Sequence, residues 1–188
     1  MKNNSILNLT LRLVIITICA GLILGLVYSV TKEPIAKQNE LKETTARQQV
    51  LPEAEDFELL EEAEEGSIIQ QIYAGTSGGD VIGYAFSVVT KGYSAGLTLT
   101  VGMSADGVVT GVNIVSHEET AGLGANATKP EFLNQYQGSD IPLTVVKTPT
   151  GAQGEITAIT GATITSDAVT GAVNTVRDYF EQNLKGGE

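Results

Sequence analysis

The residues best suited to chemistry stand together in the stretch TGATITS, from Thr160 to Ser166. Four of these seven residues carry hydroxyl groups, and Gly161 and Ala162 between them are small. A helix that starts here would offer unpaired backbone N–H groups and a positive dipole end, which together can bind a phosphate. The small neighbours would let such a ligand approach the backbone. A second interpretation stays open, in which Thr165 or Ser166 is simply the N-cap of the helix.

The composition excludes several other kinds of chemistry. Cys19 is the one cysteine and lies in an apolar run, so this chain alone makes no intrachain disulfide and no iron–sulfur centre. The one histidine, His117, cannot form a zinc site by itself, and no Ser-His-Asp pattern has support from the surrounding sequence. We therefore expect no catalytic residue and no metal site. Any redox or transfer chemistry must come from a bound group.

The elements that position the hydroxyl cluster follow from hydrophobic periodicity. Residues 67–116 favour strands, and Leu97–Met103 alternates as a half-buried strand does. The Asp-Gly pair at 106–107 predicts a tight turn, after which residues 108–116 alternate again. Two strands joined by such a turn are antiparallel.

The second half of the domain is expected to mix short elements with one long helix. A short helix is predicted over 128–136, and strands are predicted over 142–148 and 155–159. Residues 166–184 have one apolar face, and Asp167 suits the first turn of that helix. The sequence thus predicts an α+β fold, with a mostly antiparallel sheet domain and a C-terminal amphipathic helix.

The N-terminal part is expected to be a single transmembrane helix. Leu13 to Val30 are 18 residues without a charge, which as a helix span about 27 Å. Arg12 and Tyr28 suit the lipid interface at its ends. The run is too long for a signal-peptide core, and it is apolar all round, unlike a core helix of a soluble domain. Basic residues flank both ends, so charge does not fix the orientation.

Three parts are therefore expected along the chain: an N-terminal tail and transmembrane helix over 1–31, a helical stalk and acidic linker over 32–66, and a soluble domain over 67–188. Pro34 is expected in the first turn of the stalk helix. Eight acidic residues between Glu53 and Glu65 predict a solvated helix or linker. From residue 32 onward the net charge is −13, which excludes nucleic acid as a partner.

The stretch TGATITS resembles the flavinylation motif of the FMN-binding domain family. In that family the last residue of an [ST]-G-A-[ST] tetrad carries FMN through a phosphoester, which implies Thr163 as the acceptor here. The resemblance also places the neighbours Thr160, Gly161, Ala162 and Thr165 against the cofactor.

A second stretch, from Lys91 to Gly124, resembles the same family's strand–turn–strand unit and the H-x-E-T-P-G-L-G loop that follows it. Together with the anchor, the two stretches cover nearly the whole chain in the family's order. The resemblance implies that the flavin ring is contacted by Glu119, Thr120, Gly122, Leu123, Tyr93 and Ser94. His117 is a weaker candidate, because a histidine at a strand end is more often structural.

Two positions depart from the family pattern. Thr157 stands where the family usually has Asp three residues before the tetrad, in the part that the flavin transferase recognises. Ala121 replaces the usual Pro of the glycine-rich loop. A threonine hydroxyl is a poor nucleophile at neutral pH, so attachment would need that transferase.

Among family members, the chain most resembles the G subunit of Rnf-type ion-translocating ferredoxin:NAD oxidoreductases. The C subunit of sodium-pumping NADH:quinone oxidoreductases ranks second. The resemblance implies a membrane-anchored electron-transfer subunit with covalent FMN, working with other membrane, iron–sulfur and flavin subunits. It implies an extracytoplasmic domain and a cytoplasmic N-terminus. No stretch resembles a nicotinamide site, so the chain is not expected to be catalytic alone.

Two alternatives from other classes stay open. One is a flavin-free, membrane-anchored assembly or binding module, which the Thr157 departure favours. The other is a free-standing flavoprotein that relays electrons to extracellular acceptors.

Overall fold

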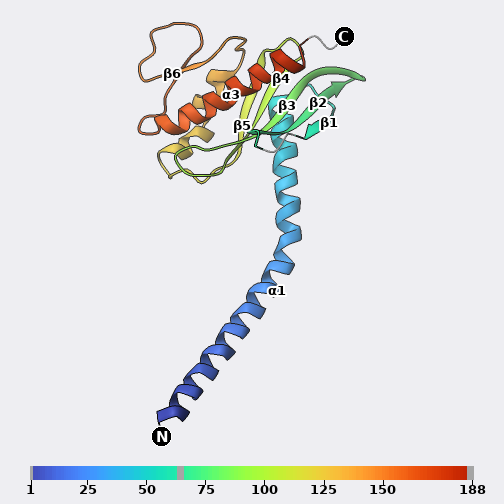
Figure 1. The fold of residues 1–188 in the computed structure, drawn as a ribbon. Coiled ribbons are helices and arrows are strands. Elements are labelled where there is room, and N and C mark those ends of the chain that lie inside the picture. The colour runs from blue at the N-terminus through green and yellow to red at the C-terminus, as the bar shows by residue number, and fades with distance from the viewer. Residues whose placement is uncertain (1, 63–65, 186–188) are drawn as a thin grey trace. The chain divides into compact units, whose positions relative to one another are not determined.

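The computed structural model describes residues 2–62 and 66–185, with side chains from residue 7 onward. Its internal contacts divide the chain into two compact units, residues 1–42 and 43–188. Helix α1 (Lys2–Val50) forms the first unit and continues into the second (Figure 1). Pro34 lies inside α1, not in the first turn of a separate stalk helix as expected, because the helix does not stop after the apolar run.

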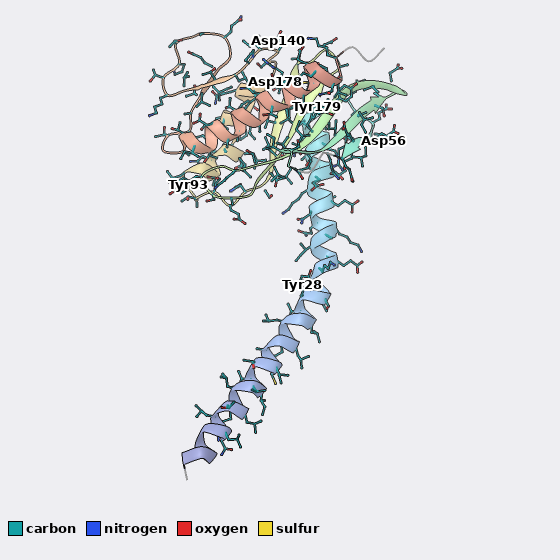
Figure 2. All side chains as sticks on the ribbon, in the orientation of Figure 1. Tyr28, Asp56, Tyr93, Asp140, Asp178 and Tyr179 are labelled. Carbon is teal, nitrogen blue, oxygen red and sulfur yellow. The ribbon has the colours of Figure 1, made fainter. Side chains whose placement is uncertain are left out.

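The apolar part of α1 exposes its side chains along its length, Tyr28 among them (Figure 2). Within the part of the chain that the structure describes, α1 is the one helix long and apolar enough to cross a membrane. Exposed apolar side chains on every face are what a lipid-spanning helix requires.

The second unit is built on a five-stranded antiparallel sheet of order β1-β2-β3-β4-β5. Its strands are β1 (Asp56–Glu62), β2 (Ile69–Ser77), β3 (Asp80–Thr90), β4 (Leu97–Ser104) and β5 (Val109–Ser116). A separate parallel pair joins β6 (Thr144–Val146) to β7 (Glu155–Thr157). The predicted α+β fold with a mostly antiparallel sheet is confirmed.

The hairpin of β4 and β5 has the predicted tight turn, in which Gly107 adopts a positive φ of 88°. The prediction that Leu97–Met103 is half-buried is wrong, because β4 is buried on both faces over most of its length. The reason is that both faces of the sheet are covered within this unit.

Helix α3 (Thr163–Asn183) covers one face of the sheet (Figure 1). Its buried side chains include Val169, Val173, Val176 and Phe180, and the ring of Phe180 meets Tyr84 edge-on at 5.8 Å between centroids. The helix begins three residues earlier than predicted from the 166–184 pattern. Asp167 therefore lies outside the first turn, where it had been expected.

The end of α1 packs on the opposite face of the sheet. Val50 lies against Gly102 and Gly111, which are paired across β4 and β5. A Cβ atom at Gly102 would stand 2.8 Å from the Cβ of Val50, so a side chain there has no room. The Thr110 hydroxyl donates to the carbonyl of Val50 at 2.6 Å. The second unit therefore needs the last residues of α1 for its own core.

Residues 56–62 of the acidic stretch form an edge strand in place of the solvated helix or linker expected there, and Glu64 and Glu65 at its end lie outside the described residues. Strand β1 pairs with β2, from Asp56 opposite Thr76 to Glu62 opposite Gln71. Its side chains are almost all exposed, which is compatible with so many acids. Charges on an edge strand oppose pairing with a second chain. We expected the sheet domain to begin at residue 67. Residues 43–62 belong to the same compact unit as the sheet, so this unit begins earlier than expected.

The short helix expected over 128–136 is broken into three turns. They are η1 (Gly124–Thr128), α2 (Pro130–Leu133) and η2 (Asn134–Tyr136). Lys129 is extended between the first two, because a residue before proline is disfavoured in the helical region. The hydroxyl of Tyr136 and that of Thr170 form a buried hydrogen bond of 2.8 Å, which ties this segment to α3.

Removal of Met1 to Thr31 is expected to leave a soluble, folded domain, since the apolar run adds nothing to the core of the second unit. Removal of residues 1–54 deletes the buried Val50 and Leu51 as well. Losing such side chains costs on the order of 4 kcal/mol, which lowers the unfolding midpoint by about 10 °C. Thermal melts followed by circular dichroism compare the two truncations. An insoluble or unfolded 32–188 fragment would contradict the boundary.

Candidate functional site

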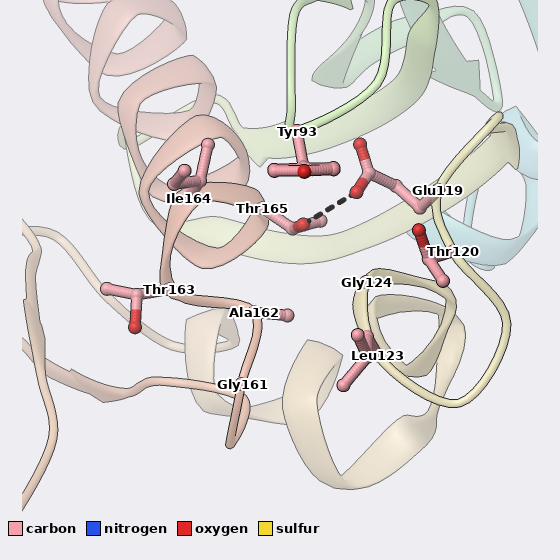
Figure 3. Close-up of a pocket in the computed structure, with 10 residues that line it drawn as sticks. All are labelled: Tyr93, Glu119, Thr120, Leu123, Gly124, Gly161, Ala162, Thr163, Ile164 and Thr165. Carbon is pink, nitrogen blue, oxygen red and sulfur yellow. Dashed lines mark hydrogen bonds between the residues drawn. The ribbon is translucent and has the colours of Figure 1, made fainter.

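A cavity of about 500 Å³ lies where the loop after β5 meets the start of α3 (Figure 3). This volume is within the range of small-molecule and cofactor sites. Tyr93 and Glu119 stand on one side of the cavity, and Gly161, Ala162 and Leu123 stand on the other. The other lining residues are Thr120, Gly124, Thr163, Ile164 and Thr165.

The carboxylate of Glu119 joins three segments that are distant in the sequence. One oxygen accepts the backbone N–H of Ser94 at 3.1 Å, and the other accepts the hydroxyl of Thr165 at 2.8 Å. The backbone N–H of Glu119 itself donates to Nδ1 of His117 at 3.2 Å. Glu119 is 8% exposed and Thr165 is fully buried. Buried polar groups that satisfy one another in this way fix the relative positions of their segments.

Two glycines, Gly92 and Gly124, leave the space that the carboxylate of Glu119 occupies. A Cβ atom at Gly92 would stand 2.3 Å from one oxygen of Glu119, and a Cβ at Gly124 would stand 2.3 Å from the other. Real Cβ atoms essentially never approach so closely, so a side chain at either position would displace the carboxylate from its present place.

The loop that leads into α3 is held by a hydroxyl of the helix itself. The side chain of Ser166 donates to the carbonyl of Ala162 at 3.0 Å and accepts the N–H of Ile159, also at 3.0 Å. Gly161 turns the loop with a φ of 77°, a conformation that favours glycine. The residues around Thr163 are therefore fixed by hydrogen bonds on both sides.

The interpretation of Thr165 or Ser166 as the N-cap is wrong. The N-cap position belongs to Ala162, which has no side-chain hydrogen bond there. Thr165 and Ser166 lie inside the helix, where their hydroxyls are used by Glu119 and by the preceding loop. The side chain of an alanine cannot accept a hydrogen bond from the first turn, so it leaves backbone donors there for a ligand.

The three threonines of the cluster have different surroundings. Thr165 is fully buried, and its hydroxyl already donates to Glu119. Thr160 is exposed and lines a separate groove of about 470 Å³ with Lys129 and Thr157. Thr163 is half-buried, begins α3 and lines the cavity with its neighbours.

Three large apolar side chains at the cavity are exposed to solvent. Tyr93 is 70% exposed, Ile164 55% and Leu123 44%. Exposed apolar residues that gather around a hollow are typical of a ligand site. Their arrangement suits a flat ligand with an apolar part.

The structure brings together eight of the eleven predicted site residues around the cavity: Tyr93, Glu119, Thr120, Leu123, Gly161, Ala162, Thr163 and Thr165. Thr160 lines the neighbouring groove, Gly122 shapes the loop with a φ of 79°, and Ser94 contributes its backbone N–H to Glu119. Two further residues line the cavity: Gly124, which belongs to the glycine-rich loop expected at the ring, and Ile164, which was not predicted. Ile164 could have been found as the one large apolar residue among the hydroxyls of TGATITS.

The two departures from the family pattern occupy different places. Thr157 ends β7, where its backbone N–H donates to the side chain of Gln135 at 2.7 Å, and it lines the same groove as Thr160. Ala121 is exposed in the loop before Gly122 and does not line the cavity.

Comparison with known proteins identifies the family. Residues 92–178 match the FMN-binding domain family. The chain is 39% identical to the G subunit of the Na⁺-translocating ferredoxin:NAD⁺ oxidoreductase complex of Acetobacterium woodii, over 95% of this chain and 93% of that protein. The chain belongs to the G-subunit family of Rnf-type ion-translocating oxidoreductase complexes.

Other G subunits agree with this assignment. The G subunit of the proton-translocating ferredoxin:NAD⁺ oxidoreductase complex of Clostridium ljungdahlii is 37% identical over 90% of this chain and 89% of that protein. The G subunit of the ion-translocating oxidoreductase complex of Methanosarcina acetivorans is 33% identical over 94% and 95%. The chain is thus a membrane-associated member of the family, with one apolar helix near its N-terminus.

Solved structures of C subunits share the fold of this G-subunit family member. The C subunit of the Na⁺-translocating NADH-quinone reductase of Parabacteroides distasonis superposes with a TM-score of 0.60 at 22% identity, over 82% of this chain and 96% of that one. NqrC of Shewanella oneidensis gives 0.53 at 20%, over 73% and 74%. At this identity the likeness concerns the fold, so the C-subunit alternative fits less well than the G subunit.

The replacement Thr165→Val is expected to destabilise the G-subunit domain by about 1–3 kcal/mol, because it leaves one oxygen of the buried Glu119 carboxylate without a donor. The control is Thr160→Val, which removes an exposed hydroxyl and should change stability by less than about 0.5 kcal/mol. Urea unfolding of the flavin-free chain measures both. Equal effects of the two replacements would show that the Glu119–Thr165 bond does not hold the site together.

Proposed function

We propose that this chain is the electron-transfer subunit of an Rnf-type complex and carries FMN through a phosphoester on Thr163. The observation that carries the proposal is the different surroundings of the hydroxyl groups in the cluster. Thr163 is the one threonine of the cluster that lines the cavity and is not bound to Glu119. The match of the family model to residues 92–178 supports the cofactor.

The cavity favours a covalent bond over a dissociable one. Among the ten residues that line it, none is Lys, Arg or His, and Glu119 adds a negative charge. Free FMN carries a phosphate dianion, which such a lining attracts poorly. The uncapped first turn of α3 offers backbone N–H groups to the phosphate, but the ester replaces the missing cation as the main anchor.

In this arrangement each part of the site has a separate task. The flavin supplies the redox chemistry, which the side chains of the chain cannot. Tyr93, Leu123 and Ile164 give apolar cover to the ring, and their exposure leaves an edge open to a partner subunit. The Glu119 bonds and the Ser166 bonds hold the loop and the acceptor in fixed positions. The chain alone is a carrier of electrons and not a complete enzyme.

A flavin-free assembly module is the second candidate function, and Thr157 is the observation that favours it. Thr157 lies in the groove beside Thr160, where an aspartate of the family pattern would place a carboxylate. If the flavin transferase needs that carboxylate, the hydroxyl of Thr163 stays unmodified. The replacement Thr157→Asp separates the two candidates.

The replacement Thr163→Ala is expected to abolish covalent flavin and to leave the fold unchanged, because Thr163 is half-buried at the start of α3. Thr163→Ser keeps a hydroxyl and should retain flavin. Thr160→Ala and Thr165→Ala test the neighbouring hydroxyls and should keep the ester. Flavin fluorescence of the denatured protein band after co-expression with the transferase gives the result, and mass spectrometry locates the modified peptide.

Each outcome of that experiment has a distinct meaning. A fluorescent Thr163→Ala band would move the attachment to another residue. A dark wild-type band with a fluorescent Thr157→Asp band would show that Thr157 prevents modification and would support the flavin-free module. A dark band for both would contradict a covalent flavin on this chain.

We further propose that the domain lies outside the cytoplasm and the N-terminus inside. In a Cys19→Ser background, Glu58→Cys on the exposed strand β1 should react with a membrane-impermeant maleimide on intact cells. Asn4→Cys, on the other side of the apolar run, should react only after the membrane is opened. The reverse pattern would overturn this orientation.

A further inference from the structure

The carboxylate of Glu119 is a fixed charge at the cavity. Among the ten residues that line the cavity it is the one carboxylate, and it is 8% exposed. The N–H of Ser94 and the O–H of Thr165 donate to its two different oxygens. A carboxylate accepts hydrogen bonds through both oxygens, and here each oxygen has one donor.

Within the described residues this carboxylate takes part in no ion pair. The ion pairs found among the described residues are Lys37–Glu33, Arg177–Asp178 and Lys185–Glu181, and none includes Glu119. A charge held away from solvent is screened much less than a surface charge and acts more strongly on its surroundings. Glu118, its neighbour in the same loop, is exposed and therefore well screened.

We propose that the buried carboxylate of Glu119 lowers the reduction potential of the FMN held in this cavity. The inference rests on the proposed function, because it needs the flavin ring in the cavity. Addition of two electrons and one proton to the ring leaves it with one more negative charge than before. A fixed negative charge beside the ring opposes that change, so reduction needs a stronger donor. Charge near the ring is a general way in which a protein tunes a flavin.

This role differs from that of holding the loops together, and the two can be separated by replacement. Glu119→Gln removes the charge but keeps the shape, because its oxygen can still accept the N–H of Ser94 while its NH₂ group donates to the Thr165 oxygen. Thr165→Val keeps the charge and removes one of the two bonds. Glu118→Gln removes an equal charge from the exposed neighbouring position.

The test uses the full-length chain in detergent, flavinylated by co-expression with the transferase. Midpoint potentials come from titration with dithionite in the presence of mediator dyes, followed by flavin absorbance. Dithionite supplies the two electrons and is oxidised to sulfite, and water supplies the proton. We expect Glu119→Gln to shift the potential to a more positive value at low and at high salt. Glu118→Gln should leave the wild-type value unchanged within error, and Thr165→Val should shift it less than Glu119→Gln does.

A Glu119→Gln shift no larger than that of Glu118→Gln overturns the inference while leaving the proposed function intact. So does a Thr165→Val shift as large as that of Glu119→Gln, since geometry and not charge would then set the potential. A wild-type chain without flavin on Thr163 overturns the proposed function and this inference together.

A second measurement covers the case in which Glu119→Gln is not flavinylated. Lumiflavin has the ring without the phosphate, and its dissociation constants for flavin-free protein are measured in the oxidised and the reduced state. By thermodynamic linkage, the ratio of the two dissociation constants gives the shift in reduction potential that the protein imposes on the bound ring. We expect the wild type to bind the oxidised form more tightly, and Glu119→Gln to reduce that ratio. An unchanged ratio, or a cavity that binds neither form, overturns the inference.

Discussion

The site depends on one buried hydrogen bond, between the hydroxyl of Thr165 and the carboxylate of Glu119. The loop before β4, the loop after β5 and the start of α3 meet at this carboxylate, and no other side chain contacts all three through hydrogen bonds among the described residues. An unpaired carboxylate at 8% exposure would be costly, so bringing the three segments together stabilises the folded domain. The geometry of the cavity is thus a consequence of satisfying one buried acid.

The same bond explains why a cluster of chemically similar hydroxyls gives one candidate acceptor. Thr165 is used by Glu119, and Ser166 is used by the loop that precedes the helix. The N-cap position is left to Ala162, which cannot satisfy the first turn. Thr163 therefore begins the helix in a first turn that no side chain caps, next to the cavity. Position in the fold, and not the reactivity of threonine, distinguishes it from its neighbours.

Local patterns in the sequence predicted those parts of the fold that depend on local physics. The strands β4 and β5, the Asp-Gly turn and the apolar face of α3 are of this kind, and all three are present, although β4 is buried on both faces. The edge strand β1 was missed for two reasons. Acidic residues disfavour strands unless both faces of the strand are exposed to solvent, as they are here. The pairing of β1 with β2 is a tertiary contact, which local patterns in the sequence do not reveal. The contribution of Val50 to the core was missed for a similar reason, since it depends on the facing glycines Gly102 and Gly111.

The site shows the same division between local and tertiary information. Family resemblance located the two loops that line the cavity, but spacing could not show that Glu119 faces Thr165, 46 positions away. The resemblance gave Glu119 a role at the ring, whereas its bonds to Ser94 and Thr165 give it a role in assembling the site. The two roles are compatible, because each carboxylate oxygen has a second lone pair that could face the cavity. The acid that is buried to assemble the site is also screened much less than a surface charge, so the assembly of the cavity and the negative charge beside it have a common origin.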